Sequence, residues 1–194
     1  MTRDEILDVF RRCSALLEGH FRLSSGLHSP GYLQCALVLQ HPGHAAALGQ
    51  DIAAGVAALK PTVVLSPALG GVIIGHEVAR ALGIRALFAE RENAVLTLRR
   101  GFRLSERERV VIVEDVLTTG GSTKETMEVA RAAGATVVAA TAIINRSGGR
   151  ASLDVPLHAL VELPLPTYQP DRCPLCEQGV LLTKPGSRPA PAGG

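Results

Sequence analysis

The chain has no tryptophan, and aromatic residues make up only 3% of its 194 residues. Because proteins often hold single-stranded nucleic acids by stacking bases on aromatic side chains, this scarcity argues against such a surface. An excess of one charge is also missing, since 20 Lys and Arg residues stand against 18 Asp and Glu residues. A net charge of +2 is far from the basic excess of nucleic-acid-binding proteins, so we expect no nucleic-acid partner.

Long apolar runs are absent as well. No stretch approaches the roughly 18 consecutive apolar residues that would indicate a membrane span. Residues 1–5 are charged and lack the apolar core of a signal peptide. We therefore expect a cytoplasmic protein without a membrane partner. Its length is sufficient for one well-packed globular domain.

The four cysteines provide only a partial metal motif. Cys173 and Cys176 have the spacing of metal ligands or of a redox pair. One such pair is half of a zinc site, and Cys13 and Cys35 lie far away in apolar surroundings, where free cysteines usually pack as small apolar residues. The sequence leaves metal binding, redox activity and simple packing open for Cys173 and Cys176.

Two common nucleotide-binding motifs are missing, the Gly-x4-Gly-Lys-Ser/Thr loop and the Gly-x-Gly-x-x-Gly turn. The strongest chemical signal lies instead in residues 110–122. Residues 110–113 are apolar, as expected of a strand buried on both faces of a parallel sheet. Glu114 and Asp115 follow at the carboxyl end, where such sheets bind ligands. Their carboxylates can accept hydrogen bonds from ribose hydroxyls or bind a metal ion.

A loop of hydroxyl groups and glycines comes next. Thr118, Thr119 and Ser122 offer hydroxyl groups, and the glycines between them allow a tight turn. A helix expected over 122–133 would point its free amides into this loop, which predicts a phosphate site. The structural alternative is a helix capping box formed by Ser122 and Glu125, but a cap would not explain the carboxylates and threonines.

Apolar periodicity predicts that helices and strands alternate. Helices are expected at 2–17, 45–59, 72–82 and 122–133, and strands at 63–66, 84–89, 110–113, 136–144 and 157–163. Two strand-like pieces lie within 20–39, and residues 91–105 suggest a hairpin or mobile loop. This alternation indicates an α/β fold with a central, mostly parallel sheet flanked by helices.

Segment 110–122 closely resembles the phosphoribosyl diphosphate motif of the type I phosphoribosyltransferases. A second segment, 19–35, resembles the N-terminal Phe-x-Leu-x-Ser-Gly-x-x-Ser signature of the orotate phosphoribosyltransferases, and 66–71 resembles their diphosphate loop. The resemblance implies one domain over 1–185 with a small N-terminal hood at about 19–40, a mobile loop at about 91–105 and a flexible tail at 186–194.

The resemblance also implies an activity, the transfer of phosphoribose from 5-phosphoribosyl 1-diphosphate to orotate. It implies Mg²⁺ held mainly by substrate, with Asp115 as the candidate protein ligand. Residues implied to bind the phosphoribosyl donor are Arg91, Glu114, Asp115, Val116, Leu117, Thr118, Thr119, Gly120, Gly121 and Ser122. Those implied to bind orotate are Thr118, Arg146, Ser25 and Gly26. A homodimer with shared active sites is expected, because the mobile loop of this family serves the neighbouring subunit.

Lysine is scarce where better-known orotate enzymes carry it. No lysine occurs between Lys60 and Lys124, and 17 of the 20 basic residues are arginine. We therefore expect Arg91 to be the leading diphosphate contact and to act in catalysis together with Asp115. Two alternatives stay open: a phosphoribosyltransferase for a purine base, which Arg146 disfavours, and a non-catalytic regulator that senses the donor and binds nucleic acid.

Overall fold

The structure is a computed structural model that describes residues 1–23 and 25–185. Its centre is a six-stranded sheet in the order β5-β4-β3-β6-β7-β8, in which every neighbouring pair except β4 and β5 is parallel. The strands are β3 (Val63–Pro67), β4 (Arg85–Glu92), β5 (Val95–Leu98), β6 (Arg109–Leu117), β7 (Thr136–Asn145) and β8 (Leu157–Glu162). The predicted α/β class with a mostly parallel sheet is confirmed.

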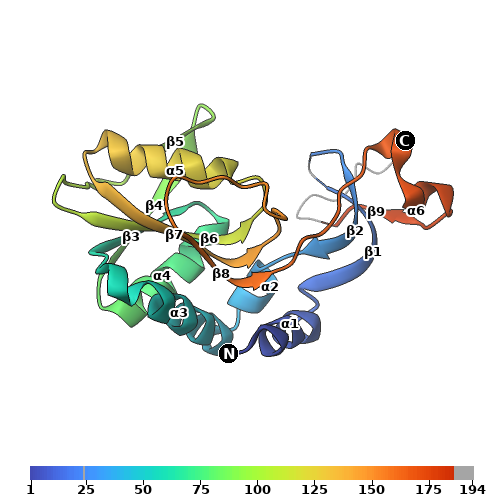
Figure 1. The fold of residues 1–194 in the computed structure, drawn as a ribbon, viewed down its shortest axis with the longest axis horizontal. Helices are drawn as coiled ribbons and strands as arrows, with labels where there is room; N and C mark the ends of the chain where they lie inside the picture. Colours follow the sequence, from blue (N-terminus) through green and yellow to red (C-terminus); the bar gives the residue numbers. More distant parts are fainter. Residues whose placement is uncertain (24, 186–194) are drawn as a thin grey trace.

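Helices cover both faces of this sheet (Figure 1). Side chains alternate along β6, so that Val111 and Val113 join one apolar cluster while Val110 and Ile112 join the other. The first cluster includes α3 (Pro42–Val56) and α4 (Gly70–Leu82), and the second includes α5 (Gly121–Ala132). Burial on both faces explains why the strand is a continuous apolar run.

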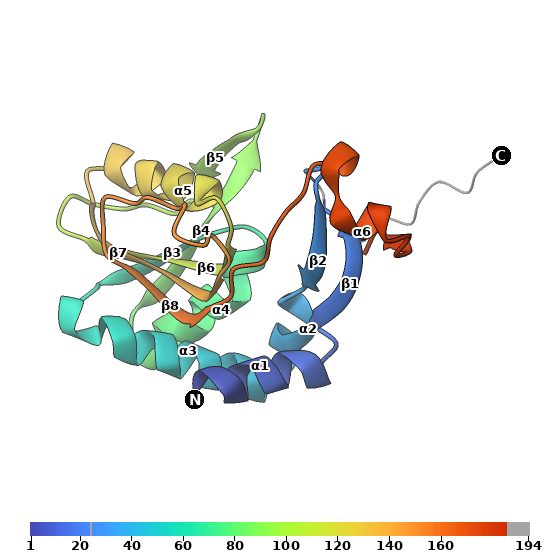
Figure 2. The same cartoon turned by 45° about the vertical axis from the view of Figure 1, so that its right-hand side comes forward.

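A second, smaller sheet stands beside the large one and forms the hood (Figures 1 and 2). Its order is β2-β1-β9, with β1 (Leu16–Arg22) antiparallel to β2 (His28–Leu33) and parallel to β9 (Leu182–Thr183). The short helices α2 (Ala36–Leu39) and α6 (Pro174–Glu177) flank it. The hood therefore combines the two ends of the described chain.

The N-terminal helix is shorter than its apolar stripe predicted. Thr2 and Glu5 form a capping box at its start, but α1 spans only Arg3–Arg12. Ser14 has a φ of 52°, which ends the helix, and residues 16 and 17 belong to β1 instead. The stripe misled because Cys13 and Leu16, which lie beyond the helix, pack against the same apolar cluster as α1.

A second correction concerns the start of α5. Its N-cap is Gly120, with a φ of 80° and no side-chain cap, so the capping box of Ser122 and Glu125 is wrong. Glycine is suited to this left-handed conformation. The preceding strand, β6, is longer than expected and ends at Leu117, so Glu114 and Asp115 lie within its last residues.

Residues 91–98 form the antiparallel β4–β5 hairpin, whose end projects beyond the sheet in Figure 2. The 3-10 turns at Ala57–Leu59 and Pro170–Arg172 complete the described elements.

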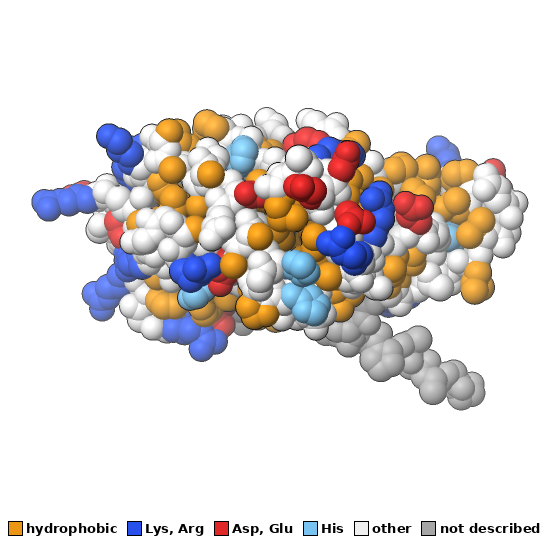
Figure 3. All heavy atoms as spheres, turned by 90° about the horizontal axis from the view of Figure 1, so that it is seen from below, with side chains coloured by type: hydrophobic (Ala, Val, Ile, Leu, Met, Phe, Trp, Pro, Cys, Tyr) orange, Lys and Arg blue, Asp and Glu red, His pale blue; other side chains and the backbone are white. Residues whose placement is uncertain are grey.

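Acidic and basic side chains are interspersed over the face shown in Figure 3, without one continuous basic patch. Within the described ranges, no helix has the length and apolar character needed to cross a membrane. The predicted tail, 186–194, lies outside these ranges.

Candidate active site

Two acidic side chains meet at the carboxyl edge of the sheet. Glu114 is 6% exposed and accepts a hydrogen bond from the Ser122 hydroxyl at 2.8 Å. Asp115 accepts one from the amide of Val116 at 2.8 Å. Ser122 thus links α5 to the acidic pair instead of capping its own helix.

These carboxyl groups hold protons more tightly than usual. Burial and the adjacent charge of Asp115 raise the pKa of Glu114 to about 8. Burial also raises the pKa of Asp115. A low dielectric disfavours two neighbouring negative charges, so the pair binds a proton more readily than two isolated carboxylates would. A metal ion or ribose hydroxyl groups would stabilise the fully ionised pair.

The loop from β3 to α4 approaches the acidic pair from the neighbouring strand. A methyl group on Gly70 would lie 2.7 Å from Asp115 Oδ1, so only glycine fits here without a shift. Strands β3 and β6 are parallel neighbours, which brings their following loops to the same edge. The 66–71 loop and the acidic pair, both recognised in the sequence, therefore lie together.

The β6–α5 loop supplies hydroxyl groups and free amides. Thr118 and Thr119 are exposed and line a cavity of about 1000 Å³. Gly120 and Gly121 begin α5, whose first amides have no partner within the helix. The positive end of the helix dipole adds to their attraction for an anion. This arrangement fits a phosphate group.

The opposite wall of the cavity comes from the hood and the C-terminal segment. Both walls together are lined by Arg22, Leu23, Ser25, Leu27, Tyr32, Gln34, Thr118, Thr119, Arg146, Arg150, Leu165, Thr167, Lys184 and Pro185. Four of these carry a positive charge and none is acidic. The cavity therefore suits an anionic ligand, which would lie between the hood and the β6–α5 loop.

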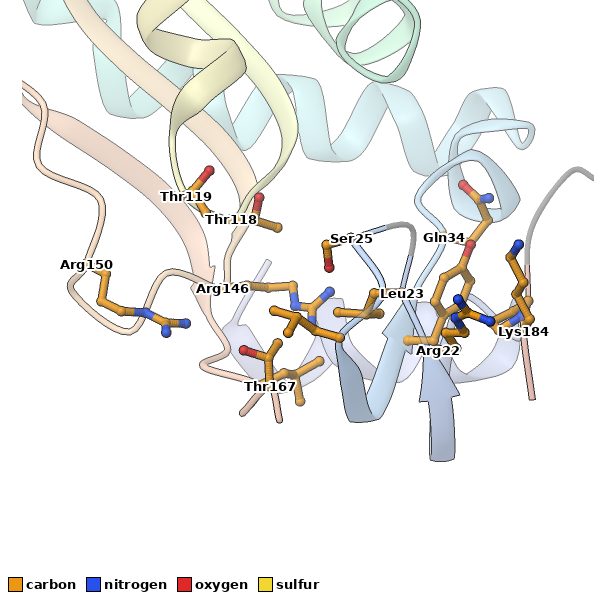
Figure 4. Close-up of a pocket in the computed structure, with 14 residues that line it drawn as sticks. Arg22, Leu23, Ser25, Gln34, Thr118, Thr119, Arg146, Arg150, Thr167 and Lys184 are labelled. Carbon is orange, nitrogen blue, oxygen red and sulfur yellow. The ribbon is translucent and has the colours of Figure 1, made fainter. Parts of the chain in front are cut away.

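Arg146 is the basic residue best placed for such a ligand. It follows β7, and Figure 4 shows its guanidinium group extending beside Ser25 and Leu23, with Thr118 above it. The Nε of Arg146 is buried and has no hydrogen-bond partner among the described residues. Burial lowers the pKa of this guanidinium. A buried, unpaired N–H group is costly, and a carboxylate could pair with it through two hydrogen bonds.

Residues 38–158 match the family model described as the phosphoribosyl transferase domain. The chain is 53% identical to the orotate phosphoribosyltransferase of Pelotomaculum thermopropionicum, over 97% of this chain and 99% of the relative. It is 49% identical to that of Desulforamulus reducens, over 97% and 98%. The chain belongs to the phosphoribosyltransferase family, in its orotate branch.

A solved structure agrees with this assignment. The orotate phosphoribosyltransferase of Aeropyrum pernix superimposes with a TM-score of 0.69 at 25% identity, covering 81% of this chain and 93% of that one. The fold of the phosphoribosyltransferases therefore extends over most of the chain, and the resemblance stated from the sequence is confirmed.

Several predicted site residues lie outside the cavity lining of this phosphoribosyltransferase. Arg91, at the start of the β4–β5 hairpin, pairs with Glu125 of α5 at 2.8 Å and donates to the carbonyl of Ala94. Gly26 lies in the hood turn with a φ of 84°, beside Ser25, which does line the cavity. Val116 donates to Asp115, and the carbonyl of Leu117 accepts from the amide of Arg146.

Some cavity residues were not foreseen from the sequence. Arg22, Tyr32 and Gln34 fall within the recognised 19–35 segment, so its family signature was the signal that could have found them. Thr167 and Lys184 come from the C-terminal segment, which joins the cavity only through the hood sheet. No local pattern marks such residues, because their position depends on contacts between the two ends of the chain.

Proposed function

We propose that the chain transfers the phosphoribosyl group of 5-phosphoribosyl 1-diphosphate to orotate, giving orotidine 5′-monophosphate and diphosphate. This reaction belongs to pyrimidine (UMP) biosynthesis. The observation that carries the assignment is Arg146, which lines the same cavity as the β6–α5 loop and whose buried Nε has no hydrogen-bond partner among the described residues. Orotate offers the planar carboxylate that such a group binds. The orotate phosphoribosyltransferase names of the relatives support the same substrate.

The donor would lie along the β6–α5 loop. Its 5′-phosphate would accept hydrogen bonds from the α5 amides and from the hydroxyl groups of Thr118, Thr119 and Ser122. Glu114 and Asp115 would accept from the ribose hydroxyls, which favours their ionised form. Val116 and Leu117 would place the loop through their backbone. Donor binding would thus supply the hydrogen-bond donors that the acidic pair needs.

The chemical step would break the bond between ribose C1 and the diphosphate oxygen and form a bond from C1 to the pyrimidine nitrogen, whose proton would pass to the leaving diphosphate. Positive charge builds on the ribose between these events. The carboxylates near the ribose would stabilise that charge, and Thr118, Arg146, Ser25 and Gly26 would hold orotate in line with C1. Orientation and electrostatic stabilisation would then account for most of the rate acceleration.

The residues of the acidic pair fit a Mg²⁺ ion carried by the donor. Each carboxylate makes a single side-chain or amide hydrogen bond among those described, leaving oxygen atoms free, and Mg²⁺ prefers oxygen ligands. When bound, Mg²⁺ would neutralise charge on the leaving diphosphate. Most of its ligands would come from the donor, with Asp115 as the protein ligand.

Arg91 and the β4–β5 hairpin would complete the site. Arg91 would leave Glu125 and bind the diphosphate, and closure of residues 91–105 would exclude water from the activated ribose. We propose a homodimer in which this loop serves the partner's cavity. The whole of residues 1–185 would act as one domain, with residues 19–40 as its hood, in the cytoplasm.

The direct test follows orotate by its ultraviolet absorbance with the purified chain, Mg²⁺ and 5-phosphoribosyl 1-diphosphate. We expect orotate to be consumed in proportion to enzyme, and diphosphate to be released in equal amount. Adenine, hypoxanthine and guanine serve as controls. Turnover of a purine without orotate would replace the proposal by the purine alternative, and donor binding without any turnover would favour the regulator.

A further inference from the structure

The hood contains four metal-binding side chains that the proposed reaction does not use. They are His20 on β1, His28 at the start of β2, and Cys173 and Cys176 at α6. Their ligand atoms all lie within 4.8 Å of one another. The exposed fractions of His20, His28 and Cys173 are only 2%, 5% and 1%. Both views of the ribbon place α6 beside β1, so two ends of the chain meet here (Figures 1 and 2).

Three nitrogen-to-sulfur distances in this cluster match those of a tetrahedral site. The Sγ of Cys173 lies 3.4 Å from His20 Nε2, and the Sγ of Cys176 lies 3.4 Å from His28 Nδ1 and 3.8 Å from His20 Nε2. The two ring nitrogens are 3.0 Å apart. Tetrahedral zinc, with bonds of about 2.1 Å to nitrogen and 2.3 Å to sulfur, spaces neighbouring ligand atoms by roughly 3.3 to 3.8 Å. A separation of the two ring nitrogens by a few tenths of an ångström would therefore admit one ion at the centre.

The second nitrogen of His20 fixes its tautomer. His20 Nδ1 lies 2.8 Å from the carbonyl oxygen of Val180, which can only accept, so Nδ1 carries the proton. The lone pair of Nε2 then faces His28 and both sulfur atoms. Metal-binding histidines almost always donate their other N–H in this way. This bond orients His20 as a ligand.

We propose that His20, His28, Cys173 and Cys176 bind one zinc ion as a structural site. Two nitrogen and two sulfur ligands in tetrahedral arrangement select zinc among the common divalent ions. All four positions are occupied by protein, which leaves no open position for a substrate. The Cys173 and Cys176 pair, ambiguous in the sequence, thus gains its other half from residues more than 140 positions away.

The site would replace an apolar core that this part of the hood lacks. Among the described residues, neither apolar cluster includes any between 164 and 185. Strand β9 has only two residues and pairs with β1 at His20 and Phe21. Zinc would hold this segment in place, and small units without enough core commonly depend on such a metal. Arg22 and Leu27, each close in sequence to a ligand, line the cavity, so the ion would also shape the orotate wall.

The test is metal analysis of the chain purified without chelators. We expect about one zinc per chain in the wild type. Cys176→Ser and His28→Asn should lower bound zinc at least ~10-fold. Their matched controls, Cys13→Ser and His44→Asn, change the same residue types outside the cluster and should keep the metal. Cobalt exchanged into the wild type should show tetrahedral visible bands and a thiolate charge-transfer band.

Two measurements on the wild type avoid variants that fail to fold. A mercurial reagent should release zinc in step with modification of the two thiols, and a chelator should lower the unfolding midpoint. Wild-type protein that takes up neither zinc nor cobalt, or a disulfide between Cys173 and Cys176 in freshly reduced and desalted protein, would overturn the proposal. Metal content is measured without turnover, so this result stands apart from the orotate assay.

Discussion

The donor end of the cavity and the hood differ in how the chain builds them. The donor end takes its acidic pair, hydroxyl groups and helix start from nine consecutive positions, 114–122. The hood joins residues 16–33 to residues 173–183. A local segment carries its chemistry in its own sequence, whereas a surface joined from both ends of the chain does not. Substitutions at the donor end should therefore affect the chemical step, and substitutions in the hood should affect the binding of orotate.

Among the variants proposed here, Asp115→Asn should lower activity the most. The variant removes a charge next to the developing ribose cation, and we expect kcat/KM to fall roughly 10³-fold. Steady-state kinetics with both substrates measures it, and circular dichroism checks the fold. Glu128→Gln, on the exposed side of α5, is the control and should keep full activity. A loss smaller than ~3-fold in Asp115→Asn would contradict the role of the acidic pair.

Glu114→Gln should change the pH dependence of stability. Burial and Asp115 raise the pKa of Glu114 to about 8, above its ordinary value, so the wild-type group contributes stability at low pH that is lost as pH rises through 8. The amide still accepts from Ser122 but does not ionise. The free energy of unfolding of the variant, relative to that of wild type, should rise by on the order of 3 kcal/mol between pH 5 and pH 9. Urea unfolding without ligands measures this gain, and parallel curves for both proteins would refute it.

Arg146→Ala tests the proposed orotate side of the cavity. Loss of a charge-assisted pair with the orotate carboxylate should raise the KM for orotate about 30-fold, with a smaller change in kcat and in the KM for the donor. Arg131→Ala is the control, since Arg131 pairs with Glu128 and Asp154 on the outside of α5. An equal rise in both KM values would remove the distinction between the two ends.

Of the proposed variants, Arg91→Ala should lower activity the least. If Arg91 leaves Glu125 to bind the diphosphate, its loss should lower kcat about 10-fold without altering the orotate KM. Glu125→Ala removes the same ion pair but keeps the cation. It should leave kcat unchanged or raise it. If both variants slow turnover equally, Arg91 acts by holding α5 rather than by contacting the leaving group.

The sequence predicted the strand and the helix around residues 114–122 for a physical reason. An apolar run, two carboxylates and a Gly-rich loop each determine their local structure, and the parallel register of β3 and β6 then brings Gly70 to Asp115. The bond from Ser122 to Glu114 was not predicted, because the sequence does not show which acceptor that hydroxyl group finds. This bond depends on how α5 packs against β6, which brings the Ser122 hydroxyl group to Glu114.

The hood was predicted only as far as its family signature reached. The segment around Ser25 was recognised, but the length of α1 was wrong because its apolar stripe continued into β1. His20 and His28 gave no signal of their own, since a histidine's partners depend on where α6 lies. The cluster at α6 required the contact between β1 and β9, which joins distant parts of the chain.

The central claim is that the β6–α5 junction binds the phosphoribosyl donor independently of the orotate wall. Calorimetric titration of 5-phosphoribosyl 1-diphosphate with Mg²⁺ into the wild type, Asp115→Asn and Arg146→Ala tests it most directly. We predict binding of one donor per chain to the wild type, a similar affinity in Arg146→Ala and a loss of at least ~10-fold in Asp115→Asn. Folded wild-type protein that gives no heat with the donor, or a loss confined to Arg146→Ala, would contradict it.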